Sequence, residues 1–405
     1  MPDSQKRQAL RVLVAPDSFK GCLEAAEVAA RIASGIRAAI PRSLVTEAPI
    51  ADGGEGTASA IARGLGGAWH HVTVLDANRN SIQLPFAVCK SAELGAFAVF
   101  DVAEIIGLPD VVLPAGVRTT KGIGQAVRAI AKQGFKTIAL GLGGSSTNDG
   151  GAGMLAELAF EFLDATGAAI DPVFDNLAQV HSIEWRVDSG WLTDIRLIGL
   201  TDVASPLAGP TGASMIFGGQ KGFRDLEQAD AVLAQFGKQC SAMLGRDLSC
   251  IEGAGAAGGL GFAVCALGGT LQPGASFILD ALQLRHEASN FDWVITGEGR
   301  SDRQTLLGKG PAIVAQLARQ AGIPVTLLSG AIDLDPALDA AFDGCFSIQP
   351  GPVSMEYAMN HAGELLERAG KQVAALFAKA MQGKIPEALN QAKACLAASS
   401  GDNPS

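Results

Sequence analysis

The chain has 405 residues, of which 48% are hydrophobic and 18% are charged. This composition can bury a large core and excludes an intrinsically disordered chain. The formal net charge is −10, which disfavours nucleic acid as a partner because an acidic protein repels the phosphate backbone.

At the N-terminal end, apolar runs alternate with helical patterns, as expected of parallel strand–helix units. A buried strand over 12–15 precedes a polar turn and a helix over 24–40, and a strand over 45–50 precedes a helix over 58–65. Short strands at 72–75, 82–88 and 96–102, separated by turn residues, then indicate a small antiparallel or mixed sheet.

Strands and helices continue through the rest of the chain. The pattern predicts helices over 122–133, 154–162 and 226–244, with buried strands over 137–140 and 195–200. A strand over 293–296, a helix over 311–321 and a strand over 325–328 form a further βαβ unit. The last predicted helix covers 356–379.

This order of elements predicts an α/β protein made of two α/β domains, one inserted into the other. Residues 1–70 and 285–380 form a discontinuous, Rossmann-like outer domain with three layers. Residues 71–284 form an inserted, mixed α/β domain, and residues 381–405 form a disordered tail.

The spacing of the cysteines and the hydropathy of the sequence indicate the cellular compartment in which we expect the protein. The seven cysteines are widely spaced without a C-x-x-C pair, which is typical of reduced thiols, so we expect a cytoplasmic protein. The N-terminus has no apolar stretch long enough for a signal peptide. The uncharged stretch 253–269 is rich in Gly and Ala and short for a membrane span, so we expect a buried helix behind a glycine turn and no membrane partner.

Several loops after apolar runs are rich in Gly, Asp, Ser and Thr. Ligands of open α/β sheets bind at the carboxyl ends of strands, where backbone N–H groups and the next helix can hold an anion. The most informative loop, LGGSSTNDGGAGM at 142–154, offers backbone donors, three hydroxyls and one carboxylate. A capped strand-to-helix turn is the alternative. The set of loops together favours a nucleotide or phosphate site.

Known nucleotide motifs are absent or incomplete. Residues 253–258 have the G-x-G-x-x-G spacing, but residues 248–252 make a poor buried strand, so a nicotinamide fingerprint is disfavoured. Residues 303–310 lack the first glycine and the final hydroxyl residue of a Walker A loop. No protein-kinase catalytic signature occurs.

Charged residues in the loops supply the remaining candidates. A lysine beside glycine can reach a phosphate or carboxylate, and loop carboxylates can hold Mg²⁺ or orient a hydroxyl. A solvated lysine or a turn-capping aspartate is the alternative for each. The candidates are Lys20, Lys221, Lys309, Asp17, Asp52, Asp149, Asp202 and Asp302.

These loops resemble those of the bacterial type I glycerate kinases. The matching stretches, in the family's order, are APDSFKG (15–21), ADGGEGT (51–57), GGSSTNDGGAGM (143–154), PLAGPTGA (206–213), QKG (220–222), GAGAAGGLG (253–261) and TGEGRSDRQTLLGK (296–309). The chain departs from the family's usual residues at Thr201, Ser205, Gly219 and Ser146, where the family has Cys, Asn, Pro and Ala. The resemblance implies ATP as donor, Mg²⁺ as cofactor, and D-glycerate as the small-molecule acceptor, with 2-phosphoglycerate favoured. Self-association is left open.

We assign roles to the candidates from their chemistry. Lys20 is predicted to bind the substrate carboxylate together with Asp17 and Ser18, and Asp149 and Asp202 are predicted to hold the metal ion. The residues predicted to bind ATP are Gly143, Gly144, Ser145, Ser146, Thr147, Asn148, Gly255 and Gly258.

The catalytic roles complete the assignment. Asp52 or Asp302 is predicted to orient the attacking hydroxyl, and Lys221 and Lys309 to neutralise the transferring phosphoryl group. On this assignment, Asp149→Asn reduces turnover and leaves the fold intact.

Three alternatives remain open from the sequence. One is a kinase for another small hydroxy acid, such as tartronate or an aldonate, which activity tests across such acids would separate. Another is a nicotinamide-dependent dehydrogenase, which a binding scan with NAD(H) and ATP would separate. The last is a ligand-binding protein without catalysis.

Overall fold

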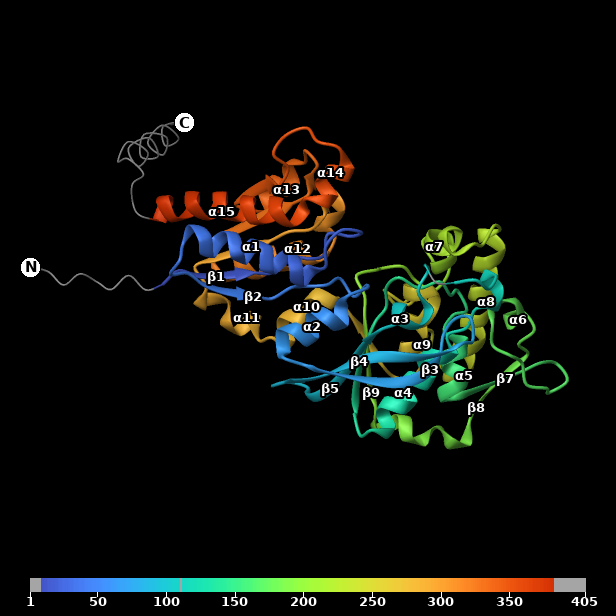
Figure 1. Ribbon diagram of the computed structural model, residues 1–405. Helices are drawn as coiled ribbons and strands as arrows, with labels where there is room; N and C mark the ends of the chain where they lie inside the picture. The colour runs from blue at the N-terminus through green and yellow to red at the C-terminus, as the bar shows by residue number, and fades with distance from the viewer. Residues whose placement is uncertain (1–8, 110, 382–405) are drawn as a thin grey trace, which may run out of the picture.

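Two β-sheets organise the chain, one in each half of the molecule (Figure 1). The computed structural model describes residues 9–109 and 111–381, so the tail predicted for 381–405 lies outside the described residues except for Met381, which ends a helix. The outer sheet has five strands and the inner sheet six. Both sheets contain parallel strands covered by helices, which confirms the predicted mixed α/β class.

The outer sheet joins the two ends of the described chain. Its strand order is β15-β13-β11-β1-β2, and every pair in it is parallel. β1 pairs with β2 on one side and with β11 on the other, so residues far apart in sequence are neighbours. The five strands are β1 (Arg11–Val14), β2 (Leu44–Glu47), β11 (Trp293–Thr296), β13 (Val325–Ser329) and β15 (Gly344–Ser347).

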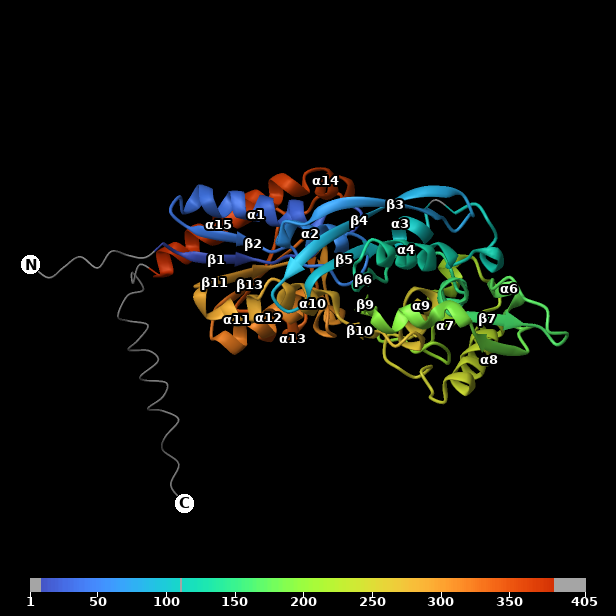
Figure 2. The same cartoon turned by 90° about the horizontal axis from the view of Figure 1, so that it is seen from below.

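Helices cover both faces of the outer sheet and give it three layers (Figure 2). On one face lie α1 (Ala25–Ala39), α14 (Met355–Asn360) and α15 (Ala362–Met381). On the other face lie α10 (Gly274–Ala281), α11 (Leu284–Glu287), α12 (Gly310–Ala321) and α13 (Pro336–Ala341). Short connections are η3 (Ala288–Asn290), η4 (Arg303–Leu306) and the paired strands β12 (Arg300–Ser301) and β14 (Ala331–Ile332).

The inner sheet is mixed, as the middle of the sequence predicts. Its order is β10-β9-β6-β5-β4-β3; β3 and β5 run antiparallel to β4, and the β5, β6, β9 and β10 neighbours are parallel. Its strands are β3 (Ala68–Leu75), β4 (Ser81–Ser91), β5 (Gly95–Asp101), β6 (Thr137–Gly141), β9 (Arg196–Leu200) and β10 (Thr270–Gln272).

Further elements of residues 57–266 surround this sheet. The helices are α2 (Thr57–Leu65), α3 (Ala103–Ile106), η1 (Ala115–Val117), α4 (Lys121–Lys132), α5 (Ala152–Leu158), α6 (Phe174–Leu177), η2 (Val187–Asp194), α7 (Ala213–Lys221), α8 (Leu226–Leu244) and α9 (Ala256–Ala266). β7 (Phe160–Leu163) and β8 (Ser182–Trp185) form a separate antiparallel pair.

Two predicted helices differ from the structure. The helix predicted over 154–162 ends at Leu158, because Phe160 and Phe162 alternate with the exposed Glu161 and form β7. The helix predicted over 356–379 is divided into α14 and α15 at His361, whose backbone is not helical. The apolar stretch 253–269 contains the buried α9, and within the described residues no helix is long and apolar enough to cross a membrane.

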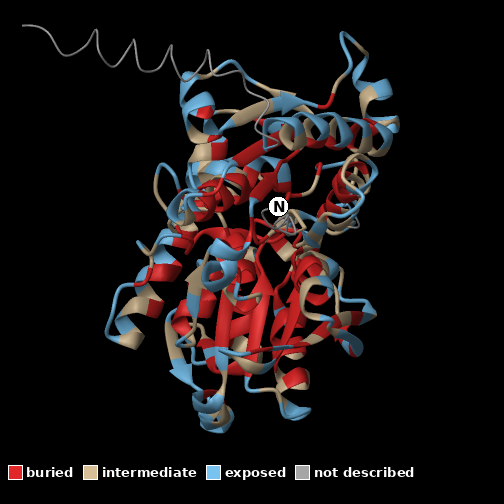
Figure 3. Ribbon diagram, turned by 90° about the vertical axis from the view of Figure 1, so that its left-hand side faces the viewer, coloured by how far each residue is buried: buried red, intermediate tan, exposed pale blue. Residues whose placement is uncertain are grey.

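One apolar core extends from the outer sheet to the inner sheet. α2 and α10 lie between the two sheets, and their buried side chains pack in one cluster with Leu13 of β1 and Phe97 of β5. Phe97 also contacts Phe277 of α10 edge to face, with ring centroids 5.7 Å apart. Buried residues accordingly fill the centre of the molecule (Figure 3). This shared core holds the two halves in a defined relation, since a large hydrophobic interface limits relative motion.

The contact between α1 and α15 yields a stability prediction. A Cβ at Gly35 would lie 2.2 Å from Glu367 O and 2.7 Å from Lys371 N, so no side chain fits there without moving α15. Gly35→Ala is therefore expected to destabilise the protein by about 1–3 kcal/mol, as overpacking does. Thermal unfolding of purified variants measures this.

Gly219→Ala is the matched control. Gly219 also lies in a helix, but a Cβ there meets nothing within 4 Å. Alanine should then be neutral or stabilising by up to about 1 kcal/mol. A Gly35→Ala variant that melts at or above the parent temperature would contradict the packing argument.

Candidate functional site

The site lies at the carboxyl ends of the outer-sheet strands β1 and β11. The chain leaves β1 for α1 on one face of the sheet and leaves β11 for α12 on the other face. This reversal is a topological switch point, where open α/β sheets bind their ligands. Asp17 and Glu298 follow the two strands directly and are both largely buried.

Two adjoining cavities open at this point. The loop cavity, of about 630 Å³, is lined by residues 17–26, 51–56, 59–60, 142–144, 201–203 and 217. The apolar cavity, of about 440 Å³, extends over the ends of β11 and β13 to α14 and α15. Both cavities are lined by Asp17, Ser18, Phe19, Lys20, Cys22 and Asp52. The carboxyl ends of β6 and β9 contribute Gly143, Gly144 and Asp202, so both sheets contribute to the loop cavity.

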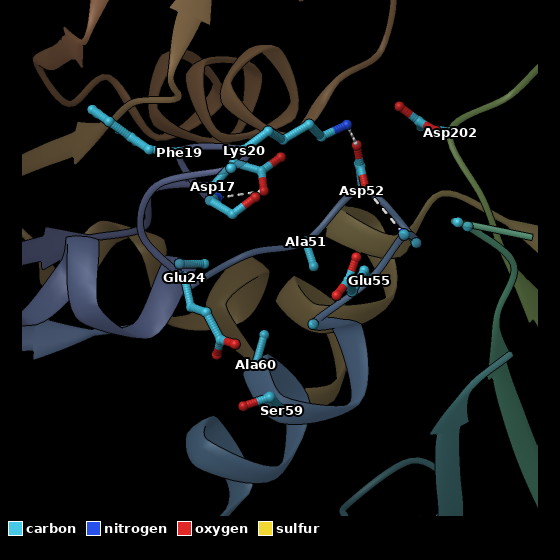
Figure 4. Close-up of a pocket in the computed structure, with 18 of the residues that line it drawn as sticks. Asp17, Phe19, Lys20, Glu24, Ala51, Asp52, Glu55, Ser59, Ala60 and Asp202 are labelled. Carbon is cyan, nitrogen blue, oxygen red and sulfur yellow. Dashed lines mark hydrogen bonds and ion pairs between the residues drawn. The ribbon is translucent and has the colours of Figure 1, made fainter. Parts of the chain in front are cut away.

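Lys20 and Asp52 form an ion pair between the two cavities (Figure 4). Lys20 Nζ donates to Asp52 Oδ2 at 3.0 Å, and Asp52 Oδ1 accepts from Gly54 N at 2.9 Å. Asp202 approaches from the facing loop, after β9 (Figure 4). These predicted site residues are therefore brought together, with a mostly exposed lysine among buried or half-buried carboxylates.

Burial and mutual repulsion set the charge state of these carboxyls. Desolvation, followed by the negative charge of Asp52, raises the pKa of Asp17 to about 8. Desolvation and Asp52 also raise the pKa of Asp202 to about 6. In return, the Asp52 carboxylate raises the pKa of Lys20. Ionisation of all these carboxyls beside one lysine is therefore unfavourable, and a bound cation would favour it.

Close backbone contacts hold the loop that carries Asp52. A Cβ at Gly53 would lie 2.5 Å from the backbone of Leu200, and a Cβ at Gly143 would lie 2.2 Å from Gly54 Cα. Only glycine allows these approaches, because any side chain would overlap backbone atoms. The glycines predicted to cradle a ligand are thus also required to bring the loops of the two sheets together.

Two buried carboxyls support the site and were not predicted. Asp101, at the end of β5, accepts from Gly56 N and Ala58 N, both at 3.0 Å, and desolvation raises its pKa to about 7. Glu298 accepts from Ser301 Oγ at 3.1 Å and Thr305 Oγ1 at 2.6 Å, and burial raises its pKa. Glu298 follows its strand as Asp17 does, so the same pattern could have identified it.

Part of the predicted ATP loop lies inside the inner half of the molecule. Ser145, Ser146, Thr147 and Asn148 are buried and line neither cavity among the described residues. Lys221 is buried with them and donates to Ser145 Oγ at 3.0 Å and Thr147 O at 2.7 Å. Desolvation lowers the pKa of Lys221 to about 7. This geometry favours a structural role for Lys221 over contact with a transferring phosphoryl group.

Asp149 has the surroundings of a structural carboxyl. It is fully buried, and its oxygens accept from Thr120 N at 3.0 Å, Thr120 Oγ1 at 2.8 Å, Gly151 N at 3.0 Å and Gly153 N at 3.4 Å. These bonds satisfy donors at the start of both α4 and α5. The predicted metal role does not follow from this geometry, because the carboxyl is already satisfied by protein donors.

The remaining predicted residues are of two kinds: glycines that the packing of the loops requires, and charged residues that line the apolar cavity. A Cβ at Gly255 would lie 2.2 Å from Pro206 O, and a Cβ at Gly258 would lie 2.0 Å from Thr147 O, so both glycines serve loop packing. Asp302 lines the apolar cavity but accepts from Gln304 N at 2.7 Å and caps η4. Lys309 lines the same cavity at the start of α12.

The cavities contain no preformed metal cage. Within the described residues, no group of three or more His, Cys, Asp or Glu side chains is arranged to hold a metal ion. Mg²⁺ in phosphoryl-transfer sites is often bound through one or two carboxylates together with substrate phosphates. Asp52 and Asp202 offer such a pair of oxygen ligands.

Comparisons with known proteins point to one family. The model of the glycerate kinase family matches residues 12–378. The chain is 35% identical to the glycerate kinase of Bacillus subtilis (strain 168) over 90% of this chain and 97% of that protein. It is 33% identical to the glycerate 2-kinase of Escherichia coli (strain K12) over 92% of this chain and 99% of that protein. A crystal structure assigned as glycerate kinase 2 from Salmonella typhimurium LT2 superimposes with a TM-score of 0.79 at 33% identity, covering 93% of this chain and 100% of that chain.

Asp149→Asn tests the structural role of this carboxyl. Asparagine replaces one acceptor oxygen with an NH₂ donor, which leaves at least one buried backbone donor unpaired at a cost of about 1–3 kcal/mol. We expect a lower melting temperature and a turnover of the folded protein within about threefold of the parent. Asp225→Asn is the control, since Asp225 caps α8 at an exposed end, where asparagine caps equally well. An unchanged melting temperature together with a large loss of turnover would mean that Asp149 takes part in the reaction.

Asp17→Asn tests the raised pKa. The pKa of Asp17 is about 8 in the folded protein and near 3.8 in the unfolded chain, so folding favours the protonated carboxyl. This contribution to the free energy of unfolding is complete only below about pH 3.8. That contribution is lost as the pH rises toward 8. The melting temperature of Asp17→Asn, relative to the parent in metal-free buffer, should therefore increase between pH 4 and pH 9. A difference that is constant with pH would mean that Asp17 titrates normally.

Proposed function

The chain belongs to the glycerate kinase family, and on this premise we propose that it transfers the γ-phosphoryl group of ATP to D-glycerate in the cleft formed by the loop cavity and the apolar cavity. The product we propose is 2-phosphoglycerate, in keeping with the name of the Escherichia coli relative. The observation that carries the proposal is the Lys20–Asp52 pair at the junction of two cavities, which gives two substrates one meeting point. We also propose a cytoplasmic location, supported by the free state of the cysteines that the structure describes.

Acceptor binding uses the positive groups of the loop cavity. α1 begins at this cavity and has no side-chain cap at its N-terminus. Its first backbone N–H groups can therefore take a carboxylate, and the helix dipole favours a negative charge there. Lys20 adds the cationic side chain of this cavity. Together these groups offset the acidic field that would otherwise repel glycerate.

Phosphoryl transfer then needs a positioned hydroxyl and charge stabilisation. The attacking oxygen forms a bond to the γ-phosphorus, the bond from phosphorus to the ADP oxygen breaks, and the hydroxyl proton passes to a carboxylate. Asp52 lines both cavities and is the group that we assign to orient the hydroxyl and accept its proton. Lys20 lies beside it and can balance charge on the phosphoryl oxygens.

A magnesium ion fits this arrangement. The chemistry of the donor set is right, because Asp202 presents hard carboxylate oxygens where burial, and then the charge of Asp52, raise its pKa, so that a cation would favour its ionised form. When bound, Mg²⁺ would supply positive charge to the phosphate oxygens of ATP. Among the predicted metal residues, Asp202 is retained in this proposal and Asp149 is not.

The activity and the role of Asp52 are tested together. Purified protein with Mg·ATP should release ADP in a coupled assay only when D-glycerate is present, and ³¹P NMR should identify 2-phosphoglycerate. Asp52→Asn keeps an acceptor for Gly54 N but cannot take up the proton, so kcat should fall by about 10²–10⁴-fold. No glycerate-dependent ADP from the parent protein would refute the proposed activity.

Asp194→Asn controls for the loss of a carboxylate. Asp194 forms a surface ion pair with Lys136 at 3.4 Å and lies outside the cleft. Both kcat and the melting temperature should stay near the parent values. If Asp52→Asn retains turnover within about threefold while Asp17→Asn loses it, the proton acceptor is Asp17.

A further inference from the structure

We infer that the apolar cavity binds the adenine ring of ATP and that the loop cavity binds glycerate, with the triphosphate running between them. This assignment rests on the proposed function and deepens it, since the family alone does not place the two substrates. It also moves the nucleotide from the 143–148 loop, where the sequence predicts it, to the face of the outer sheet covered by α14 and α15.

The wall of the apolar cavity matches a nucleobase. Ile348, Ala362 and Leu365 are buried at its base, and Met355 and Met359 of α14 stand at its edge. The two methionines are 72% and 40% exposed, so their flexible side chains are free to cover a bound ring. Methionine also packs well on aromatic rings. Adenine has two apolar faces for such a wall, whereas glycerate carries a polar group on every carbon.

Charged groups at the other end of this cavity suit a polyphosphate. Lys309 and Lys20 line the cavity where it approaches β1 and β11, and Arg300, which also lines it, is paired with Asp333 at 3.0 Å. Lys309 stands at the start of the 12-residue α12, whose N-terminus has no side-chain cap. A nucleotide with its base at α14 would thus direct its phosphates toward these cations and toward Asp52.

The loop cavity completes the arrangement on the other side of the shared residues. Asp17, Lys20 and Asp52 line both cavities, so a γ-phosphoryl group placed among them would face any acceptor in the loop cavity. A hydrogen bond from Cys22 Sγ to Met359 O, at 3.1 Å, connects the loop after β1 to α14. The base site and the transfer site are therefore parts of one connected structure.

A pair of matched substitutions separates the two cavities. Ala358 lines the apolar cavity, and Ala26 lines the loop cavity; both are half-buried alanines on helices. Ala358→Trp should weaken ADP binding on the order of tenfold or more in calorimetry with Mg²⁺, because it fills the space of the base. Ala26→Trp should instead raise the KM for glycerate and leave the dissociation constant of ADP unchanged.

Tripolyphosphate distinguishes the base site from the phosphate site. It lacks adenine, so its binding should be the same in Ala358→Trp and in the parent. ADP binding that is unchanged by Ala358→Trp would overturn the inference, and so would equal weakening of ADP and tripolyphosphate. Should Ala358→Trp fail to fold, Met359→Glu provides the same test from the exposed edge of α14, with a loss of ADP binding expected.

Failure of the proposed function and failure of the cavity assignment give different results in these experiments. If the parent protein binds ADP and Ala358→Trp does not, but no hydroxy acid stimulates ADP release, then the nucleotide site stands and the acceptor is wrong. If the parent turns over glycerate and Ala358→Trp raises the KM for glycerate alone, then the function stands and the two cavities have been assigned in the wrong order.

Discussion

The whole site depends on how closely the backbone of the Asp52 loop approaches the ends of the inner sheet. Gly53 lies against Leu200, and Gly54 lies against Gly143, at separations that exclude any Cβ. Asp101 then holds the far end of the loop through two backbone N–H groups. Because of these contacts, a carboxylate carried by a loop of the outer half is held beside residues that follow strands of the inner half, and the two sheets act as one frame around the cleft.

The two sheets place several carboxyl groups at the junction of the two cavities, where the proposed substrates are themselves anions. Asp17, Asp52 and Asp202 share a junction with Lys20, and the pKa values of Asp17 and Asp202 are raised because ionisation there is unfavourable. Such a cluster costs stability in the empty protein and becomes favourable when cations and phosphates arrive. Binding of a nucleotide with its cation would therefore reduce the repulsion among Asp17, Asp52 and Asp202 that the fold maintains.

The sequence could predict the fold class and the loops but not which loop residues face the cleft. Strand–helix alternation and glycine-rich strand ends are local patterns, and they placed Asp17, Lys20, Asp52 and Asp202 correctly at the carboxyl ends of strands. Burial is a tertiary property. The DGGAG segment around Asp149 has the composition of a phosphate loop, yet its carboxyl caps two helices in the interior. Asp101 was missed because its role depends on a loop 45 residues earlier in the chain.

The position of β1 between β2 and β11 in the outer sheet has a consequence for synthesis on the ribosome. Its partner β2 follows at once, but its other partner, β11, pairs Trp293 with Val12 and so emerges roughly 280 residues later. At about 5–20 residues per second, the open edge of β1 waits roughly 14–56 s for that strand. Through this interval a hydrophobic strand edge stays unpaired in the nascent chain, where it can recruit a chaperone or a neighbouring polypeptide. The order in which the strands are made therefore sets the earliest time at which the outer sheet can be completed around β1.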